Sequence, residues 1–437
     1  MLAWTPPARP IDPPLDSGET WFCHVNVIPM DRRRILPDFT VEVKSGVIAQ
    51  MGPSDHLKPS PGARQIDGKS DMYLLPGLAD MHFHLYFKGD LLSLLANGVT
   101  TIRNMNGRPS DLASRGQIKK GEIPGPTSFT AGPILGGPVT GHLNVHSADE
   151  AVRIVRTQHE QGYDFVKVYD DLPKDALLAT IKEAHRTGIQ VTGHINTELR
   201  AEGVMAAGQD TLEHAEQFVY HHFDHSMDES EITSFALAVN RSGSYVCPTM
   251  ELIHNYIELV DDRAGLMARP EIRFANPETI KYWAGISRTN AGFNRAIAYF
   301  QAKLVKGLAD ADVPLLSGTD THLIGFVPVF SLHREFHCMA DAGLTPYQIL
   351  QSSTATPGRC LNRKVGQIVP GYQPDLLLIH RNPLSGVSNL KDREGVMARG
   401  KWYPQLQLDE LMEDLVRSYA HQKSSDTSRK LFEEDLP

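Results

Sequence analysis

The central part of the chain alternates short apolar runs with longer stretches in which apolar residues recur at helical spacing. One such stretch, 172–188, has Pro173 near its start and Gly188 just past its expected end, as helices commonly do. The apolar runs predict strands at 77–84, 99–105, 127–133, 163–170, 189–195, 210–216, 244–250 and 313–320. Eight strands, each followed by helical material, predict an α/β fold of the (β/α)₈ barrel type.

The two ends of the chain carry a different pattern, in which short alternating strands are broken by glycines such as Gly46 and Gly52. We expect residues 20–75 and 365–405 to form one small β-sandwich domain, with the barrel of residues 76–364 inserted between them. The gap between the seventh and eighth predicted strands is the longest. We therefore expect an insertion at about 251–300 that covers the catalytic face, and a C-terminal helix with a polar tail at 406–437.

Composition narrows the class of protein. The 43 basic and 52 acidic residues give a net charge of −9, which argues against a nucleic-acid-binding protein. No stretch approaches the ~20 apolar residues of a membrane span, so we expect a soluble, cytoplasmic protein that acts on a small molecule. The four cysteines are scattered without a CxxC pair, which excludes a disulfide framework and a thiolate zinc site: Cys23, Cys247, Cys338 and Cys360.

Side chains that can bind metal ions gather at the ends of the predicted strands. The two histidines of the first strand are two positions apart and therefore point to the same side. In a barrel, the C-terminal ends of the strands converge on the face that holds the active site. The candidate metal-binding residues are His82, His84, Lys167, His194, His214 and Asp320.

These residues lie in segments that resemble the motifs of the amidohydrolase superfamily. PGLADMHFHL is similar to the first-strand motif PG-x-x-D-x-H-x-H, and GHIN, LEHAE and SGTDT resemble the motifs of the fifth, sixth and eighth strands. FVKVY resembles the fourth-strand motif of the branch whose lysine is carboxylated by CO₂. The similarity extends over roughly residues 20–410, including the C-terminal passage from LHREFH to HRNPL.

The resemblance implies a site for two divalent metal ions, zinc first, with a carboxylated Lys167 as the bridging ligand. His82, His84 and Asp320 would hold one ion, and His194 and His214 the other. A hydroxide that bridges the metals would then attack the substrate, because metal binding lowers the pKa of water to ~7. Asp320 would be the catalytic general base that passes a proton to the leaving nitrogen.

The same branch implies hydrolysis of an amide bond in a dipeptide or an N-acyl amino acid. His142, in a loop after the third strand, and Tyr220, six residues after His214, are the candidate substrate-binding residues. The chain departs from the related pattern TTxRD, since it has TTIRN with Asn104. We interpret Asn104 as structural.

Two alternatives remain open at this point. Imidazolonepropionase-like enzymes are similar in sequence but lack the bridging lysine, which leaves a mononuclear cyclic-amide hydrolase or deaminase as the second hypothesis. The third is an inactive barrel that binds a ligand or a partner protein. Substitution of Lys167 discriminates the first two. Manganese, cobalt or iron in place of zinc, and a homo-oligomeric state, are equally open.

Overall fold

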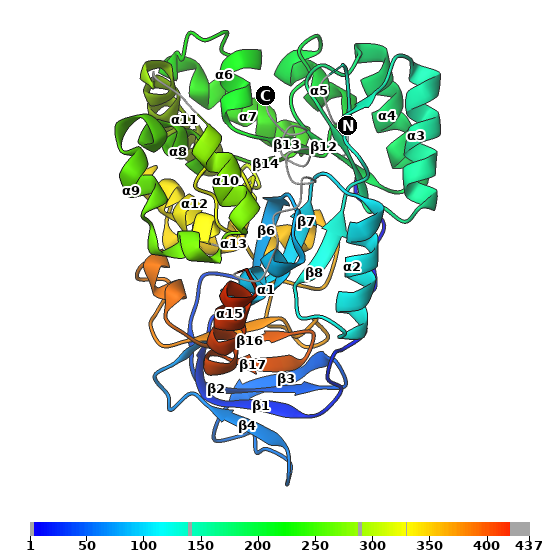
Figure 1. Ribbon diagram of the computed structural model, residues 1–437. Coiled ribbons are helices and arrows are strands. Elements are labelled where there is room, and N and C mark those ends of the chain that lie inside the picture. Colours follow the sequence, from blue (N-terminus) through cyan, green and yellow to red (C-terminus); the bar gives the residue numbers. More distant parts are fainter. Residues whose placement is uncertain (1–3, 139–141, 287–290, 329, 420–437) are drawn as a thin grey trace.

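The computed structural model describes residues 4–138, 142–286, 291–328 and 330–419, and it shows an α/β architecture with a separate sheet at one end (Figure 1). That sheet has the strand order β17-β16-β15-β5-β1-β2-β3, and β4 pairs with β1. It joins the two ends of the chain, because β15 runs antiparallel to β5, with Leu376 opposite Pro76. Its strands are β1 (Thr20–Val27), β2 (Leu36–Lys44), β3 (Val47–Pro53), β4 (Arg64–Asp67), β5 (Tyr73–Pro76), β15 (Leu376–Ile379), β16 (Arg393–Ala398) and β17 (Lys401–Pro404).

Seven of the predicted central strands are present, each shorter than predicted. β6, β7 and β8 form one parallel sheet, and β11 to β14 form part of a second, with every pairing parallel. A parallel bridge between Ala131 and Phe165 links the two sheets. The strands are β6 (Leu78–Phe83), β7 (Val99–Asn104), β8 (Thr127–Thr130), β11 (Phe165–Val168), β12 (Gln190–Gly193), β13 (Thr211–Glu213) and β14 (Tyr245–Cys247).

The eighth predicted strand, 313–320, is not a regular strand. It makes isolated parallel bridges, from Leu315 to Val246 of β14 and from Thr321 to Phe83 of β6. Asp320 has φ +59, a left-handed conformation that interrupts an extended chain. The segment still runs between β14 and β6, since Leu316 donates its N–H to Val246 and Met81 donates to Ser317.

The second sheet also contains two short strands that the sequence did not predict, β9 (Leu135–Gly136) and β10 (Leu143–Asn144). They pair with each other, and β9 bridges to β11 at Val168. The loop that carries His142 is therefore attached to the edge of the strand that carries Lys167.

Helices surround the central strands (Figure 1). The long stretch of sequence between β14 and residue 313 is also mainly helical. The predicted helix after Pro173 is confirmed as α4, which ends at Gly188 in a left-handed cap with φ 83. No helix within the described ranges is long and apolar enough to cross a membrane. The helices are α1 (Lys88–Ala96), α2 (Pro109–Lys120), α3 (Ala148–Glu160), α4 (Lys174–Thr187), α5 (Arg200–Ala207), α6 (Glu216–His221), η1 (Glu229–Glu231), α7 (Ile232–Ser242), α8 (Glu251–Asp261), α9 (Arg263–Met267), η2 (Pro270–Phe274), α10 (Pro277–Gly285), α11 (Gly292–Asp310), α12 (Phe330–Asp341), α13 (Pro346–Ser352), α14 (Ala355–Cys360), η3 (Val387–Lys391) and α15 (Gln405–Tyr419).

Candidate metal centre and active site

One cavity of about 220 Å³ is lined by all eight residues that the sequence singled out for metal or substrate. The metal-binding candidates come from β6, from β11, from the residues that directly follow β12 and β13, and from the irregular segment that ends at Asp320. Parallel strands present their C-terminal ends on the same side, which brings these distant residues together. The eight are His82, His84, His142, Lys167, His194, His214, Tyr220 and Asp320.

The imidazole rings and the Asp320 carboxylate are close enough to share a metal ion. The Oδ1 atom of Asp320 lies 3.2 Å from His82 Nε2 and 3.1 Å from His84 Nε2. One donor atom from each of His82, His214 and Asp320 falls within 4.8 Å of the others. The ring of His194 follows at 4.8 Å from that of His214. Nitrogen and carboxylate oxygen donors in this number fit Zn²⁺ and similar divalent ions.

Lys167 stands among these groups as a buried amine. Its side chain is fully buried, and within the described residues its Nζ atom has no hydrogen-bond partner. Burial lowers the pKa of Lys167 to about 8, because desolvation disfavours the ammonium form. An amine in this environment gives up its proton more readily than a surface lysine.

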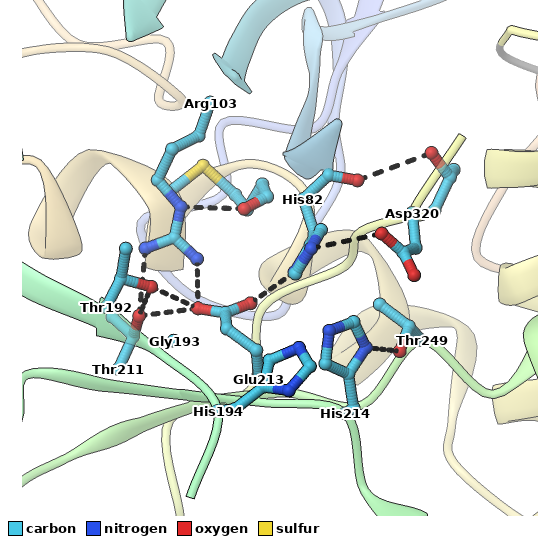
Figure 2. A network of polar contacts seen from close by, with 12 residues as sticks. His82, Arg103, Thr192, Gly193, His194, Thr211, Glu213, His214, Thr249 and Asp320 are labelled. Atoms are coloured by element: carbon cyan, nitrogen blue, oxygen red, sulfur yellow. Dashed lines mark hydrogen bonds and ion pairs between the residues drawn. The ribbon is translucent and has the colours of Figure 1, made fainter. Parts of the chain in front are cut away.

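A second layer of polar side chains fixes the orientation of His82 (Figure 2). Its Nδ1 atom lies 2.7 Å from Oε2 of Glu213, and Arg103 donates to the other oxygen of that carboxylate at 2.6 Å. The hydroxyls of Thr192 and Thr211 each donate to the same oxygen at 2.5 Å. Burial would raise the pKa of Glu213, but Arg103 and His82 outweigh it and hold that pKa well below its usual range.

Two further contacts hold other members of the site. The Nδ1 atom of His214 lies 2.8 Å from the Thr249 hydroxyl, and both residues have positive φ. Thr319, the neighbour of Asp320, donates its hydroxyl to Asp80 at 2.8 Å. Metal-binding imidazoles are commonly oriented through their second nitrogen in this way.

These supporting residues were not predicted, although three of them stand inside segments that resemble family motifs. Asp80 is the aspartate of PGLADMHFHL, Glu213 directly precedes His214 in LEHAE, and Arg103 is the arginine of TTIRN. A charged side chain within these short strands was the available signal. For Thr192, Thr211 and Thr249, the sequence contains no comparable signal.

The two candidate substrate-binding residues, His142 and Tyr220, line the same cavity as the metal-binding candidates. The ring of His142 is 4.2 Å from that of Tyr169, which in turn is 4.0 Å from His194. Tyr220 belongs to α6 and is half-buried. The rest of the wall is largely apolar and aromatic, with Ile134, Leu252, Ile253, Tyr256, Tyr282 and Leu323.

Asn104 has a structural environment. It is buried, its side-chain oxygen accepts the Leu85 N–H at 3.0 Å, and its amide donates to Asp111 at 3.4 Å. It links the segment after β6 to the start of α2 and does not itself line the cavity.

Comparisons with known proteins find relatives of this chain in both sequence and structure. An ochratoxinase from Aspergillus niger is 23% identical over 394 residues, which cover 74% of this chain and 73% of the relative. The solved structure of bottromycin amidohydrolase has 24% identity and a TM-score of 0.75, with 91% and 90% of the two chains covered. A Xaa-Pro dipeptidase with bound methionine has 18% identity and a TM-score of 0.68, with 89% and 100% covered.

These structural neighbours share the α/β amidohydrolase fold with the chain. The family comparison is more specific, because it covers all the metal-binding candidates together with β5, β15 and β16 of the sheet built from both chain ends. Residues 73–403 match the amidohydrolase family, and the chain therefore belongs to it as an enzyme related to characterised amide hydrolases.

Proposed function

We propose that this enzyme is a binuclear metal-dependent hydrolase that cleaves the amide bond of a dipeptide or an N-acyl amino acid. One observation carries the proposal: the buried Lys167 shares a cavity with four histidines and Asp320, and its Nζ atom has no hydrogen-bond partner in the part of the chain that is described. A cluster of histidines and one carboxylate, without a lysine, would suit a single metal ion. The amine between them favours a second ion with Lys167 as the shared ligand.

The same proposal includes a closed (β/α)₈ barrel, residues 76–364, beside a β-domain made of residues 20–75 and 365–405. Its support is the order of the pairings. β6, β7 and β8 connect through Ala131 to β11, then to β12, β13 and β14. Segment 313–321 bridges β14 back to β6, so each of the eight segments has a neighbour on both sides.

In this scheme His82, His84 and Asp320 would hold one metal ion, and His194 and His214 would hold the other. Lys167 would be the ligand shared by the two ions once its neutral amine has added to CO₂, which forms an N–C bond and releases a proton. The lowered pKa of Lys167, about 8, favours that reaction. Zinc or a similar divalent ion, when bound, would lower the pKa of water and polarise the substrate carbonyl.

The protein's own groups then move the proton and hold the substrate. Asp320 is the general base that takes a proton from the attacking water and gives it to the leaving nitrogen. Burial would raise the pKa of Asp320, but His82 and His214 lower it well below its usual range, which keeps the carboxylate form available. His142 and Tyr220, which line the same cavity, would contact the substrate.

The decisive experiment compares metal content and hydrolysis in the wild type and Lys167→Ala, both purified without chelator. Lys182→Ala is the matched control, because Lys182 is exposed on α4. We expect about two metal ions per chain in the wild type and control, with clearly fewer in Lys167→Ala, together with loss of activity on dipeptides and N-acyl amino acids. One ion in all three proteins would contradict the binuclear site and favour the mononuclear cyclic-amide hydrolase or deaminase.

A further inference from the structure

A buried histidine–aspartate pair borders the active-site cavity beside the proposed metal site. His322 lines the cavity, and its Nε2 atom lies 2.8 Å from Oδ2 of Asp90. The two side chains are only 1% and 2% exposed. The proposed mechanism uses neither residue.

Neither ring nitrogen of His322 has a hydrogen-bond partner among the residues described, although Nε2 lies within ion-pair distance of Asp90. A proton on Nε2 would face the Asp90 carboxylate, which only accepts hydrogen bonds. In that tautomer the buried Nδ1 offers a lone pair to a ligand. Leaving a buried acceptor unsatisfied is costly, which favours a ligand that supplies an N–H group.

The pair is held rigidly from two sides. Asp90 also accepts the backbone N–H of Phe87 at 3.0 Å, at the start of α1. The Trp283 indole of α10 donates to the backbone oxygen of His322 at 3.1 Å. The free nitrogen is therefore fixed in place before a ligand arrives, which reduces the entropic cost of binding.

The surroundings favour a positively charged donor. The carboxyl group of Asp90 lies 2.8 Å from the His322 ring and is the acidic group that faces it. Aromatic rings lie close to that of His322, with centroid distances of 5.9 Å to Phe83, 5.2 Å to Tyr86 and 6.0 Å to Phe87. Aromatic faces attract cations, and charge-assisted hydrogen bonds are stronger than neutral ones.

We infer that His322, supported by Asp90, binds a protonated amine of the substrate and so makes this enzyme selective for amino-bearing substrates. The inference rests on the proposed amide hydrolysis and narrows its substrate class. A dipeptide provides the group as its α-ammonium, whereas an N-acyl amino acid provides it only through a basic side chain. His322 is thus a specificity residue, and Asp90 is a positioning residue.

Matched substrates separate these sources. Alanyl-phenylalanine and propionyl-phenylalanine differ only in the α-ammonium, and propionyl-lysine moves the amine to a side chain. We expect the wild type to hydrolyse one of the two amine-bearing compounds with a kcat/KM at least about tenfold above that for propionyl-phenylalanine. The preferred compound identifies the source of the amine.

Two variants test the pair itself. Asp90→Asn can keep the oxygen that faces both the Phe87 N–H and His322 while it replaces the carboxyl group by a neutral amide, and Asp175→Asn, exposed on α4, is the control. We expect Asp90→Asn to reduce the tenfold preference towards one, mainly through KM, with the metal content of the wild type. His322→Gln should reduce the preference in the same way, and Asp175→Asn should leave it unchanged.

A binding measurement keeps the inference testable without turnover. Alaninamide carries an ammonium group that propionamide lacks. By calorimetry, the metal-loaded wild type should bind alaninamide at least about tenfold more tightly than Asp90→Asn does, while propionamide should not distinguish the two proteins. Equal binding of both amides by the wild type, or equal losses for all substrates in Asp90→Asn, would overturn the inference. Absence of any hydrolysis with the binding preference intact would instead contradict the proposed amide hydrolysis.

Discussion

The Nδ1 atom of His82 lies 2.7 Å from Oε2 of Glu213, and both side chains are completely buried. The opposite oxygen of Glu213 is occupied by Arg103 and two threonine hydroxyls. The carboxylate can therefore accept the N–H of His82 without rotating. This fixes the tautomer in which His82 Nε2 points its lone pair towards Asp320 and the proposed metal site.

Glu213→Gln should weaken metal binding by about 10–100-fold. A glutamine side chain has one donor end and one acceptor end. If its amide NH₂ group faces Arg103, two hydrogen-bond donors oppose each other. If the NH₂ group faces His82 instead, the His82 ring must adopt the other tautomer. Competition with a chelator of known affinity measures the effect.

The control for this change is Glu160→Gln, because Glu160 is exposed at the end of α3. It should bind metal as the wild type does. If Glu213→Gln also retained wild-type metal affinity, Glu213 would have no role in orienting His82.

Thr319→Val should lower the free energy of unfolding by about 1–3 kcal/mol. Valine keeps the shape of threonine but removes the hydroxyl that donates to Asp80, and thus leaves a buried carboxyl oxygen with one partner fewer. Urea denaturation of the metal-free protein measures the change. Thr157→Val, on the exposed side of α3, should change stability by less than about 0.5 kcal/mol. Equal values for the two variants would contradict the proposed role of the Asp80 contact.

The sequence predicts the central strands and the gathering of metal-binding residues because polar side chains interrupt apolar runs at their C-terminal ends. His82, His194 and His214 all stand at such positions, so a barrel-type arrangement places them on one face. Seven strand positions and the helix of 174–187 follow from periodicity and from Gly188. The domain boundaries and the role of each site residue stay predictions.

The remaining features of the fold and the site depend on tertiary contacts, which the hydrophobic periodicity of the sequence does not encode. Residues 313–320 are apolar enough for a strand, but Asp320 adopts positive φ while the chain remains bonded to its neighbours on both sides. Arg103 belongs to TTIRN in a predicted strand, but only the fold places it against Glu213. β9 and β10 are two residues each, too short for an alternating pattern to predict them.

Two glycine-to-alanine substitutions should have opposite effects. A Cβ atom on Gly318 would stand 2.5 Å from His82 Cβ and 2.6 Å from Cys247 Sγ, so Gly318→Ala should displace His82 and destabilise the protein by about 1–3 kcal/mol or more. Gly116, inside α2, has open space around that position, and Gly116→Ala should stabilise the protein by up to about 1 kcal/mol. Thermal unfolding and metal content check both. A Gly318→Ala protein with wild-type Tm and metal content would refute the close approach of these two segments.

Glu335 should make the stability of the wild type fall as the pH rises. Burial raises the pKa of Glu335 to about 7, from 4.5 for an unperturbed glutamate. The folded state therefore holds a proton that the unfolded chain releases, and the associated stability is complete below pH 4.5 and is lost as the pH rises through 7. Glu335 accepts the N–H of Glu251 at 2.9 Å, a bond that a glutamine oxygen can also accept.

Glu335→Gln should remove this pH dependence. Between pH 5 and pH 8 the wild type should lose about 2–3 kcal/mol more of its unfolding free energy than Glu335→Gln loses. Urea denaturation measures the difference. A chelator is present in every sample, so that all proteins are metal-free at both pH values and loss of metal at low pH does not contribute. Glu160→Gln should follow the wild type. If Glu335→Gln followed it as well, Glu335 would be ionised in the folded protein at both pH values, and its buried carboxyl would need a compensating cation beyond the contacts described.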